Sequence, residues 1–226
     1  MIALDDVLVT AYSPDPDGGA DRVVRLLGPV TLELAERRIA IVGANGSGKS
    51  TLARLLNGLV LPSSGTVRVD GLDTGRDGAA VRRRVGFMFT DPDAQLVMPT
   101  PVEDVALSLR RLPLTPAERE VAARAALARF GLQDRAEVPV HALSGGQRQL
   151  LALASVLATE PAVLVCDEPT TLLDLRWRGV VDRLLDDLDA ALRAERVLVV
   201  DDGSVVFDGD PVAAVASYRA LMEVSS

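Results

Sequence analysis

The sequence predicts an α/β fold: a mostly parallel core sheet, an N-terminal antiparallel β subdomain and an inserted helical subdomain. Three observations predict it. Two short apolar runs, 39–42 and 163–166, have the character of buried parallel strands. The first is followed directly by a glycine-rich run and the second by two carboxylates. Strand-like alternation marks the region before residue 70, and helical periodicity dominates from about 102 to 158.

The elements can be assigned in order along the chain. Residues 1–42 predict strands around a turn-rich loop at 13–19, a helix follows residue 49, and 66–70 and 85–89 predict short strands. Helices are predicted at 102–111, 117–130, 148–158 and 175–193, and a hairpin at 197–207. We expect a single domain over 1–226, with its core at about 1–89 and 159–226 and a helical subdomain at about 90–158.

Composition narrows the function. The chain has 226 residues, 48% of them apolar, which is ample for a core. Its net charge of −8 argues against a nucleic-acid binder, and its one cysteine, Cys166, fits a reducing compartment. Neither a signal peptide nor an apolar run of the roughly 20 residues that span a bilayer is found. We therefore expect a cytoplasmic protein whose membrane role, if any, comes through a partner.

One lysine, Lys49, stands among 24 basic residues, inside a glycine-rich run. A compact ammonium can enter a ring of backbone amides and touch two phosphates, which a planar guanidinium does poorly. The spacing G-x-x-x-x-G-K-[ST], after an apolar strand and before a helix, is that of a phosphate loop. We expect a nucleoside triphosphate on the loop, and magnesium on the hydroxyl of Ser50. The loop residues are Gly43, Ala44, Asn45, Gly46, Ser47, Gly48, Lys49, Ser50 and Thr51.

Two carboxylates follow the second apolar run. Asp167 stands at the end of the predicted strand, where it can hold magnesium through water. Glu168 is the next residue and points differently, which suits a catalytic base that polarises the attacking water.

The run Leu143-Ser144-Gly145-Gly146-Gln147-Arg148-Gln149 resembles the signature sequence of ATP-binding-cassette (ABC) ATPases, and the resemblance covers nearly the whole chain. It implies an ABC-type P-loop fold and a dimer with ATP and Mg²⁺ as cofactors. Ser144, Gly145, Gly146 and Gln147 would cap the γ-phosphate held by the other chain. Asp174 matches the dimer-contacting loop, and Tyr12 is either the aromatic that stacks on adenine or an ordinary strand-edge tyrosine.

The stretch from Phe89 to Val105 resembles the ATPases of energy-coupling-factor importers, which take up vitamins, cobalt and nickel, with biotin-type ATPases most similar. That resemblance implies a transmembrane coupling subunit docked on this stretch, a substrate-binding membrane subunit, and a place on the cytoplasmic face of the membrane. The family's first glutamine is Thr90 here. Its hydroxyl could still meet magnesium or water, at shorter reach.

The family pattern breaks after Asp174. Relatives carry a further strand and a histidine that contacts the γ-phosphate, whereas the one histidine here, His141, lies upstream of the signature. In one alignment this block is missing between about 181 and 187. In the other, 197–200 becomes that strand, with Asp201 and Asp202 at the histidine position. An aspartate beside a γ-phosphate would repel it.

Three functions follow from these patterns. We expect the ATPase subunit of a membrane importer, driving vitamin or metal-ion uptake. The first alternative is a nucleotide-binding but hydrolysis-impaired half of a heterodimer, which the missing histidine favours and Glu168 disfavours. The second is a soluble ABC protein without a membrane partner.

Overall fold

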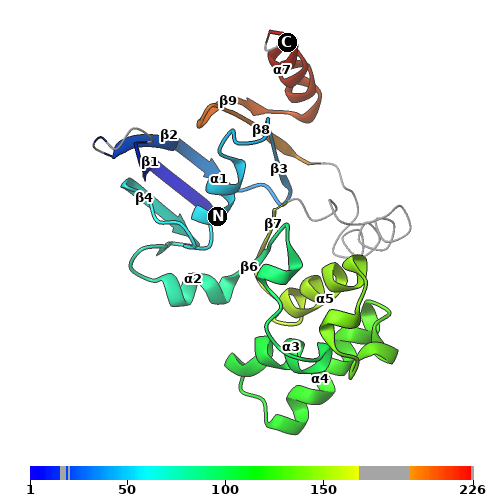
Figure 1. Ribbon diagram of the computed structural model, residues 1–226. Helices are drawn as coiled ribbons and strands as arrows, with labels where there is room; N and C mark the ends of the chain where they lie inside the picture. The colour runs from blue at the N-terminus through cyan, green and yellow to red at the C-terminus, as the bar shows by residue number, and fades with distance from the viewer. Residues whose placement is uncertain (16–18, 20, 168–193, 225–226) are drawn as a thin grey trace. The chain divides into compact units, whose positions relative to one another are not determined.

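The computed structural model describes residues 1–15, 19, 21–167 and 194–224. The chain divides into two compact units, one formed by Met1–Arg82 and Arg193–Ser226 and the other by Arg83–Leu192 (Figure 1). The predicted single domain, with its boundaries at 90 and 158, stays a prediction. The helix predicted at 175–193 lies outside the described residues.

The first unit contains the predicted antiparallel β sheet. Its strand order is β2 (Arg22–Leu34), β1 (Ile2–Ser13), β4 (Ser64–Val69) and β5 (Leu72–Asp73). Ile2 lies opposite both Leu34 and Val69, and all three side chains are buried. The alternating apolar residues of these strands therefore face one side, which explains the pattern in the sequence.

A second sheet in the same unit supports the phosphate loop. β3 (Ile39–Val42) pairs in parallel with β8 (Arg196–Asp201), which turns into antiparallel β9 (Ser204–Gly209). α1 (Lys49–Leu55) follows the loop after β3, and α7 (Pro211–Val224) packs on β8 through Ala214 (Figure 1). The predicted hairpin is confirmed. The sequence reasoning missed α7.

The second unit is mainly helical. α3 (Pro101–Ser108), α4 (Pro116–Arg129) and α5 (Gly145–Leu157) enclose an apolar core that includes Val105, Leu127, Phe130, Leu150 and Leu153. A parallel pair, β6 (Val85–Met88) and β7 (Val163–Cys166), borders it. α2 (Gly78–Arg84), most of which belongs to the first unit, precedes β6. Short 3₁₀ turns of the second unit lie at Pro92–Ala94, Leu109–Arg111, Gln133–Arg135 and Val140–Ala142.

α3, α4 and α5 each begin with a capping box, in which a Ser or Thr and a Glu or Gln three residues later hydrogen-bond to each other's backbone amides. For α5 the Ser144 amide donates to Gln147 Oε1 at 2.9 Å, and the Gln147 amide donates to Ser144 Oγ at 3.2 Å. The helix therefore begins at Gly145, three residues before the predicted start at Arg148. The capping box explains the difference, because it satisfies the backbone amides of Ser144 and Gln147 and so fixes the first turn at Gly145.

Candidate functional site

The phosphate loop lies tightly against its neighbours. A Cβ at Gly43 would lie 2.1 Å from the Val200 carbonyl oxygen, so only glycine fits beside β8. Gly48 has φ 107°, and a Cβ there would lie 2.9 Å from the Leu26 carbonyl oxygen. Glycine alone adopts this left-handed conformation without strain, so the loop can close on itself just before α1.

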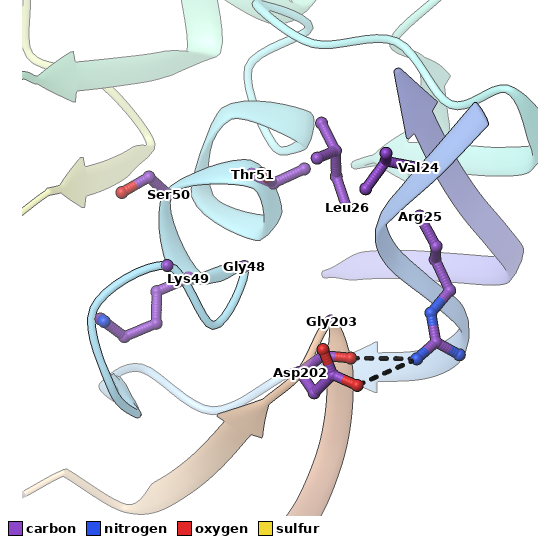
Figure 2. A pocket seen from close by; sticks show the side chains of 10 residues that line it. Val24, Arg25, Leu26, Gly48, Lys49, Ser50, Thr51, Asp202 and Gly203 are labelled. Atoms are coloured by element: carbon purple, nitrogen blue, oxygen red, sulfur yellow. Dashed lines mark hydrogen bonds and ion pairs between the residues drawn. The ribbon is translucent and has the colours of Figure 1, made fainter. Parts of the chain in front are cut away.

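Lys49 is folded into the loop (Figure 2). Its Nζ donates to the Gly43 carbonyl at 2.9 Å and to the Ala44 carbonyl at 2.7 Å. An ammonium has three N–H donors. Two of them bond to the carbonyls and fix the charge at the loop, and the third remains for a ligand. The geometry is that of a positive charge held ready for an anion.

A cavity of about 350 Å³ opens beside the loop, within the usual size range of ligand sites. Figure 2 shows it between the start of α1, strand β2 and the β8–β9 turn. Its lining residues are Val24, Arg25, Leu26, Gly46, Gly48, Lys49, Ser50, Thr51, Asp202 and Gly203. Five of the nine predicted loop residues therefore line one cavity.

Sequence reasoning missed the contribution of β2 to this cavity. Val24, Arg25 and Leu26 lie far from the loop in sequence, and they reach it because the β8–β9 turn packs on both. The Gly203 amide donates to the Ser47 carbonyl at 2.9 Å, and the Gly28 amide donates to the Gly203 carbonyl at 2.6 Å. No local pattern reports such a contact. Asp202 could have been found, because one alignment already placed it at the γ-phosphate.

In the second unit, Thr90 and Asp167 lie together. The Thr90 hydroxyl donates to the Asp167 backbone carbonyl at 2.9 Å, and the Asp167 amide donates to the Met88 carbonyl at 2.9 Å. Asp167 is buried, with 7% of its surface exposed. Because the Thr90 hydroxyl donates its only proton here, its lone pairs remain available as acceptors.

Gln95 has a structural role. Its Nε2 donates to the Ala152 carbonyl of α5 at 2.9 Å, and its Oε1 accepts from the Phe89 amide at 3.4 Å. Both ends of this amide are therefore engaged within the helical unit.

A model of the ABC transporter family matches residues 27–171, which is more than half of the chain. The chain belongs to the ABC transporter family. A putative ABC transporter ATP-binding protein of Deinococcus radiodurans is 49% identical over 87% of this chain and 92% of that protein. The biotin transport ATP-binding protein BioM of Rhizobium etli is 42% identical over 86% of this chain and 92% of that protein.

The structural relatives agree with this assignment. The ABC cassette MJ0796 in a dimeric post-hydrolysis state, bound to ADP and Pi, has a TM-score of 0.80 at 27% identity, covering 93% of this chain and 98% of that one. The structure of cbiO1 from Clostridium perfringens, part of the ABC transporter complex cbiONQ, has a TM-score of 0.73 at 28% identity, covering 99% and 93%. The predicted fold class is confirmed, and the chain is an ABC ATPase of the energy-coupling-factor type.

Several predicted residues of this ABC ATPase remain untested. Glu168, Asp174 and the gap near 181–187 lie outside the described residues. Tyr12 pairs with Val23 across β1 and β2 and is 78% exposed, next to the strand segment that lines the cavity. His141 is exposed in the 3₁₀ turn Val140–Ala142, within the helical unit.

The oxygen donors predicted for magnesium are of the type that this cation prefers, namely hydroxyl and carboxylate oxygens. Ser50 lines the cavity of the first unit, and Asp167 directly follows β7 in the other unit. The described ranges hold no cluster of three or more His, Cys, Asp or Glu side chains that could bind a metal by itself. No described helix has both the length and the apolar character needed to cross a membrane.

Proposed function

We propose that this chain binds and hydrolyses ATP as one half of a dimer in an energy-coupling-factor importer, and so drives vitamin or metal-ion uptake. The observation that carries the proposal is the phosphate loop: Lys49 is held by two carbonyls of its own loop, beside a cavity of about 350 Å³. The loop residues from Gly43 to Thr51 bind the phosphates, and Tyr12 stacks on the adenine.

Hydrolysis needs a charge-neutralising cation and a base. Magnesium, when bound, neutralises charge that develops on the phosphates; Ser50 and Asp167 would hold it, with the lone pairs of Thr90 as a weaker ligand. Glu168 polarises the attacking water. Lys49 contributes its ammonium to the β- and γ-phosphates.

The signature loop acts on the partner's nucleotide. The amides of Gly145 and Gly146 lie in the first turn of a helix of 13 residues, while the Gln147 amide donates to the cap, Ser144 Oγ, at 3.2 Å. Such a helix start attracts anions, which supports its role against a γ-phosphate held by the second chain. Asp174 supports the opposite site in the same dimer.

The partners are a second ABC ATPase chain, a transmembrane coupling subunit and a substrate-binding membrane subunit, on the cytoplasmic face of the membrane; nucleic acid is not a partner. The coupling subunit contacts the stretch from Thr90 to Val105. Val97 supports this docking, because its apolar side chain is 71% exposed there. The relatives named for biotin transport and for the cbiONQ complex support the importer role.

A second candidate is a hydrolysis-impaired half of a heterodimer. It is favoured by the position of the chain's single histidine, His141, in the helical unit before the signature.

ATP turnover by the purified chain with its membrane partner separates the two candidates. The importer ATPase predicts turnover at least 100-fold above that of a Glu168→Ala variant, since the base is lost. Turnover equal to that variant, with MgATP still bound, would leave the hydrolysis-impaired half.

A further inference from the structure

An ion pair lies on the rim of the nucleotide cavity. Arg25 Nη2 of β2 donates to the Asp202 backbone carbonyl at 3.1 Å and lies 3.7 Å from Asp202 Oδ2 (Figure 2). The two side chains are 46% and 99% exposed, and both residues line the same cavity as Lys49. The pair therefore faces the space that a nucleotide would enter.

Fold stability does not explain this pair. An ion pair as exposed as this one contributes little to folding. The β8–β9 turn is already anchored through its backbone, by Gly203 to the Ser47 carbonyl and by Gly28 to the Gly203 carbonyl. The Arg25 side chain adds one hydrogen bond to this anchoring, at the Asp202 carbonyl, and the exposed ion pair adds little more.

The guanidinium of Arg25 has capacity to spare. It carries five N–H donors, and within the described residues it makes the one hydrogen bond and the one ion pair given above. Phosphate oxygens are the acceptors that a guanidinium fork binds best.

The charges of the cavity also point to a phosphate ligand. Its lining carries two positive side chains, Lys49 and Arg25, and one negative side chain, Asp202. A carboxylate beside bound phosphates repels them, and an arginine paired with it cancels that repulsion. The two side chains therefore act on an anionic ligand with opposite sign.

We infer that Arg25 is a nucleotide-contacting residue, which binds the phosphates of a nucleoside di- or triphosphate. Asp202 is its internal counterion, and competes with those phosphates for the guanidinium. This inference rests on the proposed function, because it assumes that the cavity takes the nucleotide held by Lys49.

Calorimetric titration of MgATP into the full chain and its variants tests the inference. Arg25→Gln weakens binding about tenfold, because a charge-assisted hydrogen bond to phosphate is lost. Asp202→Asn tightens binding about two- to fivefold, because a repulsive charge is removed and Arg25 is released. Arg25→Lys keeps the charge but loses the planar fork, so its affinity for MgATP should lie between those of the wild type and Arg25→Gln.

Arg22→Gln is the matched control. Arg22 lies on the same strand, also forms an ion pair at 3.7 Å, with Asp15, and does not line the cavity. The MgATP affinity of Arg22→Gln should stay within about twofold of that of the wild type. The melting temperatures without nucleotide are compared in parallel, and those of Arg25→Gln and Asp202→Asn should match the control.

Arg25→Gln and Asp202→Asn test the role of Arg25 through opposite changes in MgATP affinity. Changes of MgATP affinity in the same direction, or affinities of both equal to the wild type, overturn the role of Arg25. Lys49→Ala is measured alongside. If it binds MgATP as tightly as the wild type, the proposed function itself fails. If it loses binding while both Arg25→Gln and Asp202→Asn match the wild type, only the Arg25 inference fails.

Discussion

Asp104 offers a sharp test of how the helical unit is held together. The residue is 4% exposed in α3, and its carboxylate accepts three hydrogen bonds. Oδ2 accepts from the amides of Val97 and Met98 at 2.9 and 3.1 Å, and Oδ1 accepts from Ser155 Oγ at 3.0 Å. The carboxylate thus ties the segment before α3 to α5.

The three contacts set the expected magnitude. A hydrogen bond to a charged group contributes about 1.5–3 kcal/mol, and part of this offsets the cost of burying the carboxylate. We expect Asp104→Ala to lower the free energy of unfolding by about 3 kcal/mol. Asp104→Asn keeps an acceptor for both amides and should cost about 1 kcal/mol, similar to Ser155→Ala.

Urea unfolding followed by circular dichroism measures the free energies, and hydrogen exchange reports the Val97 and Met98 amides directly. Asp134→Ala is the control, because Asp134 is an exposed aspartate of the same unit, and it should change stability by less than about 0.5 kcal/mol. A loss below about 1 kcal/mol for Asp104→Ala, with both amides still protected, would show that the Asp104 carboxylate does not hold the segment before α3.

Three further predictions concern single residues. Burial raises the pKa of the Cys166 thiol to about 12, so a disulfide reagent at pH 8 should label the folded chain at least about 100-fold more slowly than the urea-unfolded chain; equal rates would contradict this. Hydrogen bonds from Arg196 lower the pKa of Asp208, so its stabilisation is present above about pH 4 and is lost as the pH falls through the folded pKa. Asp208→Asn should flatten the acid limb of a stability–pH curve, and an unchanged limb would exclude that role. Gly43→Ala would place a Cβ 2.1 Å from the Val200 oxygen, and should cost about 2–4 kcal/mol in urea unfolding as well as MgATP affinity; a variant of wild-type stability would show that the loop is less tightly packed.

Local chemistry made much of the fold predictable. The runs 39–42 and 163–166 are strands as expected, because four apolar residues rich in Val and Ile are too few for a helix and favour a buried strand. The start of α5 was misplaced by three residues, although Ser144 and Gln147 already spell a capping box. α7 was missed although its start signal is local: Asp210 Oδ1 accepts from the amides of Val212 and Ala213 at 3.0 and 3.1 Å, and Pro211 is the first helical residue.

The site was predictable only where it is contiguous in sequence. Lys49 and its glycines form one motif whose spacing itself reflects phosphate geometry. Arg25 reaches the same cavity through a contact between β2 and the β8–β9 turn. Its partner in that contact, Asp202, lies 177 positions further along the sequence. No periodicity or spacing encodes such a pairing, so this residue needed the structure.

We propose that a compact ammonium at position 49 holds the phosphates, and MgATP binding to Lys49→Arg tests this role most directly. This variant keeps the charge but replaces the ammonium that donates to the Gly43 and Ala44 carbonyls with a planar fork. We predict saturable MgATP binding by the wild type and an affinity at least about 30-fold lower for Lys49→Arg, with an unchanged circular dichroism spectrum. Binding of MgATP by Lys49→Arg at wild-type affinity would show that an ammonium at position 49 is not required.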